Sequence, residues 1–335
     1  MVKSKKSKKQ KDKKRKKKGN SLIVLIIAVL LIGAVVVVSK VKRGEPVKII
    51  KAEVLAEFDG VESKAGKLNS PRGIAISNDN FLYVADLNNH RICKFTLDGK
   101  MVNAFGKKGN KEGEFNEPSG VATDNQNNIY VADAWNGRIQ KFSSDGKYIM
   151  EIGGPKAGFY SPRNVAVNKY GVLFVADTGT SRVHRFDLEG NRIGKPVGGA
   201  GKALDKFLEV FSIAFDSKNN VYVSDVGNRR IVVLTSDLNP MYFIKIKVWN
   251  ETPPLWPMIA IDSNDLLYVS SSGSKEIIVY NLKTKKPKYV GTIKLDVKDK
   301  PIFSDPLGIA IDKENNIYVS EVARSKILKI KPIFN

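Results

Sequence analysis

The sequence is poor in the residues that build disulfides and metal sites. Its 335 residues include one cysteine, Cys93, and two histidines, His90 and His184. A single cysteine excludes an intrachain disulfide and a zinc site built on several cysteines, and two histidines are too few for most histidine-rich metal centres. We therefore expect no bound metal and no cofactor.

Acidic residues are also few relative to basic ones. The chain has 56 Lys and Arg against 34 Asp and Glu, a formal net charge of +22. Residues 1–20 hold twelve Lys or Arg against Asp12, and residues 40–51 hold five against Glu45, which leaves +7 for the rest of the chain. Nucleic-acid binding normally uses a strongly basic folded surface, so we expect no nucleic-acid partner.

One long apolar run stands near the N-terminus. Residues 22–38 contain no polar side chain, and as a helix of roughly 26 Å they would just span a membrane. We predict a transmembrane signal-anchor helix over 21–39; the alternative is a cleaved signal peptide, which usually has a shorter apolar region and a small-residue cleavage site.

The charges that flank this run predict how the protein is oriented. Basic residues are concentrated before it, which favours a cytoplasmic N-terminus and a single-pass protein of the cell membrane. Residues 1–20 then form a disordered cytoplasmic tail that contacts anionic lipid, and residues 40–48 a juxtamembrane stem. Residues 49–335 would lie on the extracytoplasmic side.

An internal repeat fills the rest of the chain. Six 25-residue segments align without gaps, and their starts are 47, 44, 48, 46 and 50 residues apart. In chain order, repeats 1 to 6 are residues 71–95, 118–142, 162–186, 210–234, 256–280 and 306–330. Each reads as strand, Asp/Asn turn, strand, short loop and strand, and a fourth strand follows most of them. A period in the forties with short strands is typical of propeller blades.

The ends of the repeat region predict how the ring closes. Residues 331–335 are too few to supply a fourth strand after repeat 6, whereas residues 49–58 have strand character and precede repeat 1. We predict that residues 49–58 pair with repeat 6 and remove the open edge.

The repeats carry a family resemblance. The pattern Pro-x-Gly-Ile-Ala, then Tyr-Val-Ala-Asp, then Asn-x-Arg-Ile and Phe resembles the NHL repeat. Six copies are similar to an NHL propeller, which implies an all-β fold: a six-bladed β-propeller over 49–335, closed by an N-terminal strand and preceded by one transmembrane helix.

An Asp and an Arg recur five residues apart in four successive repeats. A catalytic carboxylate seldom recurs in this way, so we interpret them as structural turn pairs in which Asp accepts backbone hydrogen bonds and Arg pairs with it. The predicted pairs are Asp86/Arg91, Asp133/Arg138, Asp177/Arg182 and Asp225/Arg230.

Ligands of propellers normally bind at one end of the ring. Loops that lead into the first strand of each repeat, and loops between the second and third strands, should meet at that end. Arg, Asn and exposed aromatic side chains there suit anionic groups, sugars or a peptide. The predicted ligand-binding face consists of Arg72, Asn88, Asn89, His90, Trp135, Asn136, Arg163, Asn164, Arg229 and Trp256.

These features predict a membrane-anchored extracytoplasmic binding or scaffold module that recognises a protein, peptide or glycan. The alternative is an enzyme, because the resemblance extends to propeller lactonases and amidating lyases, which hold a divalent metal in the central channel. No inward carboxylate stands out from the repeat pattern, so the sequence favours binding over catalysis.

Overall fold

The computed structural model describes residues 23–29, 34–40, 48–153, 158–250, 256–294, 296–297, 300–301 and 303–334, with the backbone alone at 23–29, 34–40, 296–297 and 300–301. The chain divides into two compact parts, Met1–Lys48 and Ile49–Asn335. The predicted tail over 1–20 lies outside the described residues, as does most of the predicted stem.

The N-terminal part differs from the predicted helix over 21–39. It contains two antiparallel strands, β1 (Ile23–Val29) and β2 (Ala34–Lys40), with Ile23 opposite Lys40. Across the described ranges, no helix is long and apolar enough to cross a membrane. The local reason is composition: ten of the seventeen residues in 22–38 are Ile or Val, whose branched side chains favour strands.

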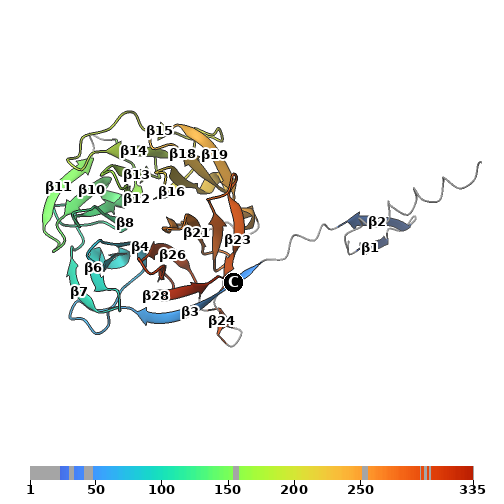
Figure 1. Cartoon of the computed structure of the whole chain (residues 1–335), viewed down its shortest axis with the longest axis horizontal. Helices are drawn as coiled ribbons and strands as arrows, with labels where there is room; N and C mark the ends of the chain where they lie inside the picture. Colours follow the sequence, from blue (N-terminus) through green and yellow to red (C-terminus); the bar gives the residue numbers. More distant parts are fainter. Residues whose placement is uncertain are drawn as a thin grey trace, which may run out of the picture. The chain divides into compact units, whose positions relative to one another are not determined.

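The second part is a ring of small antiparallel sheets (Figure 1). Its described residues form four sheets of four strands and one of eight, with a short extra pair, β24 (Asp296–Val297) and β25 (Lys300–Pro301). The eight-stranded sheet has the order β20-β21-β22-β23-β3-β28-β27-β26.

Each repeat supplies strands in the same order. The first strands are β4 (Pro71–Ile76), β8 (Pro118–Thr123), β12 (Pro162–Val167), β16 (Val210–Phe215), β20 (Ile259–Ile261) and β26 (Pro306–Ile311). The second strands are β5 (Phe81–Asp86), β9 (Ile129–Asp133), β13 (Leu173–Asp177), β17 (Val221–Asp225), β21 (Leu266–Ser271) and β27 (Ile317–Glu321). The third strands are β6 (Arg91–Thr96), β10 (Arg138–Phe142), β14 (Arg182–Phe186), β18 (Arg230–Leu234), β22 (Glu276–Asn281) and β28 (Lys326–Ile333). Fourth strands follow as β7 (Met101–Phe105), β11 (Tyr148–Gly153), β15 (Val197–Gly198), β19 (Pro240–Lys245) and β23 (Lys288–Ile293).

The first strands lie innermost, and each contacts the first strand of the next repeat until β26 contacts β4 again. An alanine occupies the fifth position of every repeat, where crowding is greatest, for example Ala122 and Ala310. Glycine at the third position serves the same need: a Cβ at Gly120 would lie 2.7 Å from Asn164 Cα, and one at Gly308 would lie 2.2 Å from the Arg72 carbonyl oxygen.

The predicted closure by residues 49–58 is confirmed. Strand β3 (Ile49–Phe58) pairs antiparallel with β28, from Phe58 opposite Ile327 to Lys51 opposite Ile333. Its first two residues also pair in parallel with β23, where Ile49 lies opposite Thr292. The blue strand from the N-terminal end therefore lies beside the red strands of the C-terminal end (Figure 1).

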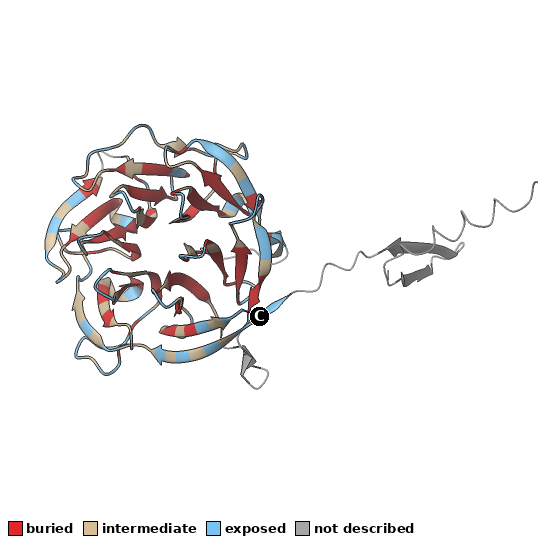
Figure 2. Ribbon diagram, in the orientation of Figure 1, coloured by how far each residue is buried: buried red, intermediate tan, exposed pale blue. Residues whose placement is uncertain are grey.

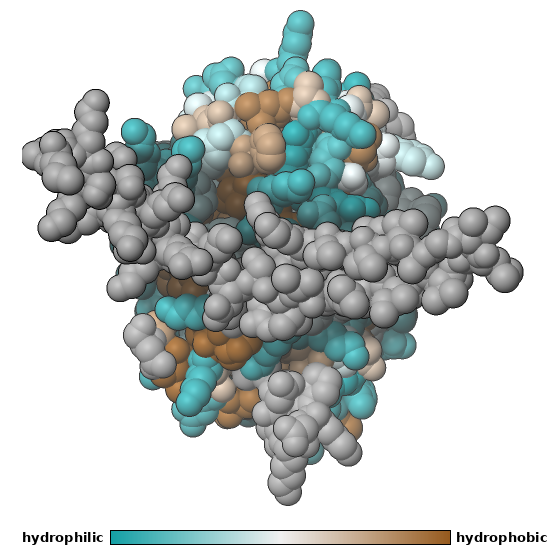
Figure 3. Space-filling model, turned by 90° about the vertical axis from the view of Figure 1, so that its right-hand side faces the viewer, coloured by the Kyte–Doolittle hydropathy of each residue, from teal (hydrophilic) through white to brown (hydrophobic). Residues whose placement is uncertain are grey.

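Burial decreases from the middle of each sheet outward (Figure 2). Second strands such as β9 and β17 are buried at every residue, whereas the outer strands β11 and β3 alternate between more and less exposed residues. On the side seen in Figure 3, the coloured surface mixes hydrophilic and hydrophobic residues. The core therefore lies between neighbouring sheets, and the loops at the two ends of the ring are left for other roles.

Candidate functional site

The strands of each repeat alternate in direction, so two sets of loops meet at one end of the ring. These are the loops that lead into the first strands and the loops between the second and third strands. We call this end the rim. All ten residues of the predicted ligand-binding face belong to these loops or to the beginnings of the first strands.

Three of the predicted Asp/Arg pairs come together as ion pairs. Arg91 Nε lies 2.7 Å from an Asp86 carboxylate oxygen, and the same contact measures 2.9 Å for Arg138 and Asp133. In repeat 4, Arg230 Nε lies 2.8 Å from Asp225. Each Asp is fully buried and also accepts a backbone N–H from the loop that leads into its repeat, as Asp225 does from Leu208. These pairs tie two loops of one repeat together.

The pair predicted in repeat 3 needs correction. Arg182 is exposed, and His184 takes its place, with Nε2 3.6 Å from the buried Asp177 carboxylate. Asp177 also accepts hydrogen bonds from Thr180 Oγ1 and the Tyr160 N–H. His184 stands two residues further along β14, where its side chain points to the same face of the strand as that of Arg182.

Most of the predicted asparagines have internal partners. Asn89 and Asn136 end short 3₁₀ helices, η2 (Leu87–Asn89) and η3 (Ala134–Asn136), and each donates to the Asp of its repeat at 2.8 Å. Asn88 donates to Asn69 Oδ1. Asn164 is buried and accepts the Ile213 N–H, which joins repeat 3 to repeat 4. These four side chains therefore support the loops and the contact between repeats.

Two further predicted residues lie at the edge of the rim. His90 has a left-handed backbone, and its Nδ1 accepts the Glu117 N–H at 3.1 Å. Burial lowers the pKa of His90, so the ring is neutral when it accepts this bond. Arg229 is exposed, and its guanidinium donates to the Asn250 carbonyl at 3.5 Å.

The remaining four predicted residues form two cation–aromatic pairs. The Arg72 guanidinium lies 3.9 Å from the centre of the Trp256 ring, and that of Arg163 lies 5.6 Å from the centre of the Trp135 ring. Trp256 also lies 6.4 Å from Phe211, measured between ring centres. Trp135 Nε1 donates to Glu117 at 2.6 Å, while 57% of Trp135 stays exposed.

Three carboxylates complete this set. Glu117 and Asp305 act electrostatically on Arg72, and Glu117 and Glu209 act on Arg163. We call the whole set the rim cluster: Arg72, Glu117, Trp135, Arg163, Glu209, Phe211, Trp256 and Asp305. Its members come from repeats 1 to 5 and from the residues directly before repeats 2, 4 and 6, and Arg72 reaches from repeat 1 past repeat 6 to Trp256 in repeat 5. The rim cluster therefore lies around the axis of the ring.

Burial dominates the electrostatics of the rim cluster. Desolvation, and then the positive charge of Arg163, lower the pKa of Arg72 to about 10. Desolvation also lowers the pKa of Arg163 and raises the pKa of the Glu209 and Asp305 carboxyls. All four groups lose hydration, which makes their interactions with one another and with an incoming charge stronger than in water.

Sequence reasoning missed Glu117, Glu209, Phe211 and Asp305. Each stands directly before a repeat or at its second position, next to the positions that carry Arg72 and Arg163. The second position varies between the repeats, with Arg72, Ser119, Arg163, Phe211, Pro257 and Leu307. This variation, three positions before an invariant alanine, was the available signal.

The described residues offer no group of three His, Cys, Asp or Glu side chains close enough to hold a metal ion. His90 and His184 lie in different repeats and have different partners. The donor set that the metal-dependent alternative needs is therefore not met by these residues.

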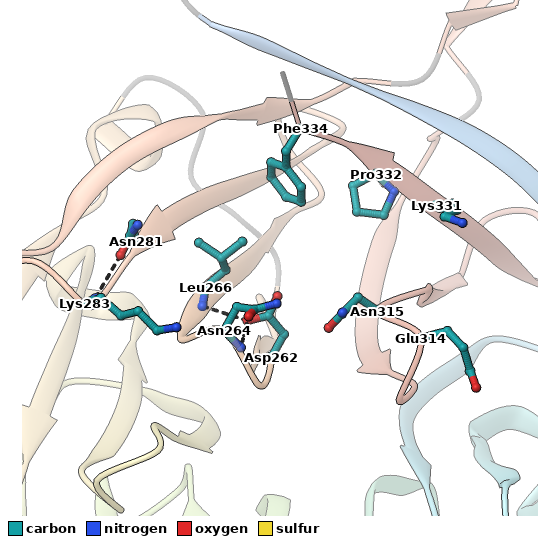
Figure 4. Close-up of a pocket in the computed structure, with 10 residues that line it drawn as sticks. All are labelled: Asp262, Asn264, Leu266, Asn281, Lys283, Glu314, Asn315, Lys331, Pro332 and Phe334. Atoms are coloured by element: carbon teal, nitrogen blue, oxygen red, sulfur yellow. Dashed lines mark hydrogen bonds between the residues drawn. The ribbon is translucent and has the colours of Figure 1, made fainter.

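A cavity of about 460 Å³ lies at the opposite end of the ring (Figure 4). Leu266 and Phe334 line it together with polar side chains of the turns around Asp262 and Glu314. Asp262 already accepts the Asn264 and Leu266 N–H groups and the Tyr268 hydroxyl. The same Asp-to-Tyr contact recurs at Asp124 and Tyr130, so this cavity is lined by structural turns.

Comparison with known proteins identifies the repeats. The model of the NHL repeat matches residues 68–95 and 115–142. The RING finger protein nhl-1 of Caenorhabditis elegans is 43% identical over 54 residues, which are 16% of this chain and 6% of that protein. The chain therefore carries NHL repeats, and it matches only a small part of that relative.

Solved structures agree on the fold. A virginiamycin B lyase from Staphylococcus aureus has a TM-score of 0.58 at 15% identity, over 84% of this chain and 100% of that chain. A gluconolactonase from Xanthomonas campestris has a TM-score of 0.60 at 16% identity, over 79% of this chain and 87% of that chain. At such identities the likeness shows the fold alone: the chain has a β-propeller fold and carries NHL repeats at residues 68–95 and 115–142.

Proposed function

We propose that this chain is a binding module that recognises a protein, peptide or glycan through the rim cluster. The observation that carries the proposal is the contrast between repeated and unrepeated polar groups. The Asp/Arg pairs recur because the fold uses them, whereas the rim cluster has an arginine at the second position of repeats 1 and 3 alone and a tryptophan at different positions of repeats 2 and 5. Charged and aromatic side chains gathered at one end, with Trp135 exposed, suit ligand recognition.

The experiment compares two exposed aromatic residues. The ligand set captured on the intact protein is measured for the wild type, for Trp135→Ala and for Tyr170→Ala; Tyr170 is 69% exposed in the turn between β12 and β13, at the other end of the ring. We expect Trp135→Ala to lose ligands that Tyr170→Ala retains. Identical losses in both variants would remove the rim from consideration.

We propose further that the ring has six blades. The eight-stranded sheet counts as two blades of four strands, β20 to β23 and β26 to β28 with β3. The closed cycle of contacts among the six first strands supports this count.

We also propose that residues 21–39 anchor the chain in the cell membrane, with the basic tail on cytoplasmic anionic lipid and the propeller outside. The apolar run and the basic residues before it support this orientation. The single cysteine offers a clean test, because Cys93 is buried and burial raises the pKa of its thiol.

In intact cells, a membrane-impermeant maleimide should label Lys218→Cys on the propeller but not Ser7→Cys in the tail. Labelling of Ser7→Cys alone would reverse the orientation. Release of the wild-type protein by alkaline carbonate would contradict the anchor.

An enzyme is the second candidate, favoured by one observation. Glu209 and Asp305 are rim carboxyls whose pKa values are raised by burial, as is common for general acids and bases. The lyase and lactonase propellers share only the fold with this chain. If the candidate is right, turnover of a lactone or cyclic ester by the purified protein should be lost in Glu209→Gln and Asp305→Asn. No turnover by the wild type would leave the binding function as the better account.

A further inference from the structure

Arg72 is buried without the hydrogen bonds that a buried arginine normally makes. Only 7% of the residue is exposed, yet Nε and one terminal nitrogen, Nη1, are fully buried and have no hydrogen-bond partner among the described residues. Its carbonyl oxygen is used, since it accepts the Ser320 hydroxyl at 2.7 Å. Buried polar atoms are almost always paired, and an unpaired buried donor is costly.

Two other buried arginines have a hydrogen-bond partner on every nitrogen, and Arg185, whose Nε is buried and unpaired, still donates through Nη1 to the Ser236 carbonyl and to Asp237. Arg230 is 6% exposed and uses all three nitrogens: Nε donates to Asp225, Nη1 to the Lys202 carbonyl, and Nη2 to the carbonyls of Ala203 and Lys206. Arg138 is equally well supplied. The fold can satisfy a buried guanidinium fully, and at Arg72 it does not.

Aromatic and charged groups of the rim cluster surround Arg72. Trp256 covers one face of the guanidinium. Arg163 is close enough to lower the pKa of Arg72, while Glu117 and Asp305 oppose this effect. Within the described residues, neither Arg72 nor Arg163 forms an ion pair within 4 Å with these carboxylates. The two guanidinium groups thus repel each other, and Glu117, which acts on both, offsets part of this repulsion.

We propose that Arg72 and Arg163 bind a carboxylate of the ligand, with each guanidinium donating to one of its two oxygens. The proposal rests on the rim cluster being the ligand-binding site. Guanidinium N–H groups make strong, charge-assisted hydrogen bonds to carboxylate oxygens. Trp256 and Phe211 offer an apolar surface to the carbon skeleton next to that carboxylate.

The three acidic residues of the rim cluster favour a singly charged carboxylate over a phosphate. Glu117, Glu209 and Asp305 surround the two arginines, so a doubly charged group would meet more repulsion than a singly charged one. The ligand class is therefore a monocarboxylate attached to an apolar or aromatic group.

The test uses two probes that differ only in this group. N-acetyl-phenylalanine carries a carboxylate, and N-acetyl-phenylalaninamide replaces it with a neutral amide. Binding to the full-length protein is followed by calorimetry and by tryptophan fluorescence, with inorganic phosphate as a third probe. We expect the carboxylate to bind at least ~10-fold more tightly than the amide and than phosphate. Equal binding of the carboxylate and the amide, or no saturable carboxylate binding, would overturn the proposal.

Substitutions at Arg72 test whether this residue is responsible for carboxylate binding. We expect Arg72→Gln to weaken carboxylate binding at least ~10-fold, and Arg72→Lys to recover only part of it, because a lysine keeps the charge and loses the planar guanidinium with its additional donors. Arg182→Gln, an exposed arginine outside the rim cluster, is the matched control and should bind as the wild type does. Thermal melting shows whether each variant is folded. Full carboxylate affinity in folded Arg72→Gln would refute the assignment.

The two proposals fail separately. If Trp135→Ala loses its ligands while the carboxylate probe does not bind, the rim remains the site and the carboxylate assignment is wrong. If the probe requires Arg72 but Trp135→Ala retains every ligand, Arg72 binds a carboxylate and the wider rim function is wrong.

Discussion

Arg230 and Arg72 are buried to the same extent and lie in opposite situations. Arg230 begins strand β18 of repeat 4, where Asp225 and three carbonyls of the loop that leads into this repeat occupy its donors. Arg72 sits in the rim cluster, where groups from other repeats surround it and two of its nitrogens have no partner. Burial alone therefore does not identify a functional arginine; the state of its donors does.

The largest expected effect comes from opening the ring. A chain that begins at residue 61 lacks β3, so β28 and β23 lose their partner strand and buried residues such as Ile293 and Ile330 are exposed. We expect loss of the cooperative thermal transition, with the rim cluster affected more than the Arg230 loop, because the rim cluster needs every repeat in place. A melting curve like that of a chain beginning at residue 48 would show that closure is dispensable.

Removing the carboxylate partner of Arg230 should have the next largest effect on stability. Asp225→Ala leaves a buried guanidinium unpaired and takes an acceptor from Leu208 and Asn228, which should cost about 3 kcal/mol of unfolding free energy. Denaturant unfolding measures it. Asp237→Ala, whose carboxylate is largely exposed beside Arg185, is the control and should unfold as the wild type does. A loss at Asp225 no larger than at Asp237 would contradict a structural role.

The two arginines should respond to the same substitution with opposite sign. Arg230→Met leaves Asp225 buried and unpaired, so it should destabilise the fold by about 2–3 kcal/mol. Arg72→Met removes unpaired donors and keeps an apolar side chain against Trp256, so stability should stay the same or rise by about 1 kcal/mol. Parallel melting curves decide this. Equal destabilisation by both would mean that Arg72 has a structural role.

The smallest effect concerns pH. Burial raises the pKa of Asp305 above its ordinary value of 3.8, although Arg72 acts against the shift. The folded state therefore holds this proton more tightly than the unfolded state, and the stability it contributes is complete below pH 3.8 and lost as pH rises through the raised pKa. Asp305→Asn should remove that loss, so the difference in melting temperature between variant and wild type should grow from acidic to neutral pH. A difference in melting temperature that does not change with pH would mean that the Asp305 carboxyl is hydrated in the folded protein.

The repeat pattern predicted most of the propeller, because the same strand and turn residues recur in six repeats. The period and the strand residues gave the sheets, and the lack of a last strand after residue 330 pointed to β3. The turn pair of repeat 3 could not be predicted from spacing, because His184, two residues beyond Arg182 on the same face of β14, lies beside Asp177 instead. The apolar run at 22–38 is ambiguous for a physical reason, since Ile and Val suit both a membrane helix and a strand.

The rim was harder to predict, because its residues meet only in three dimensions. Residue type alone predicted Arg72, Arg163, Trp135 and Trp256. The same reasoning also predicted Asn89, Asn136 and Asn164, whose side chains make hydrogen bonds within the protein. No pattern within one repeat shows that Arg72 crosses to Trp256, since the two residues belong to repeats 1 and 5.

The double pairing of β3 has a consequence for how the protein is made. As the ribosome synthesises the chain, β3 emerges before any other strand of the propeller, but its partners in β23 and β28 are among the last to appear. Until β23 and β28 have been synthesised, the backbone groups of β3 have no partner at one end of the nascent chain. The sheet that β3 will join is incomplete at the other end. The interval before these ends meet is when a chaperone is most needed and when a second nascent chain could donate its β3 by mistake.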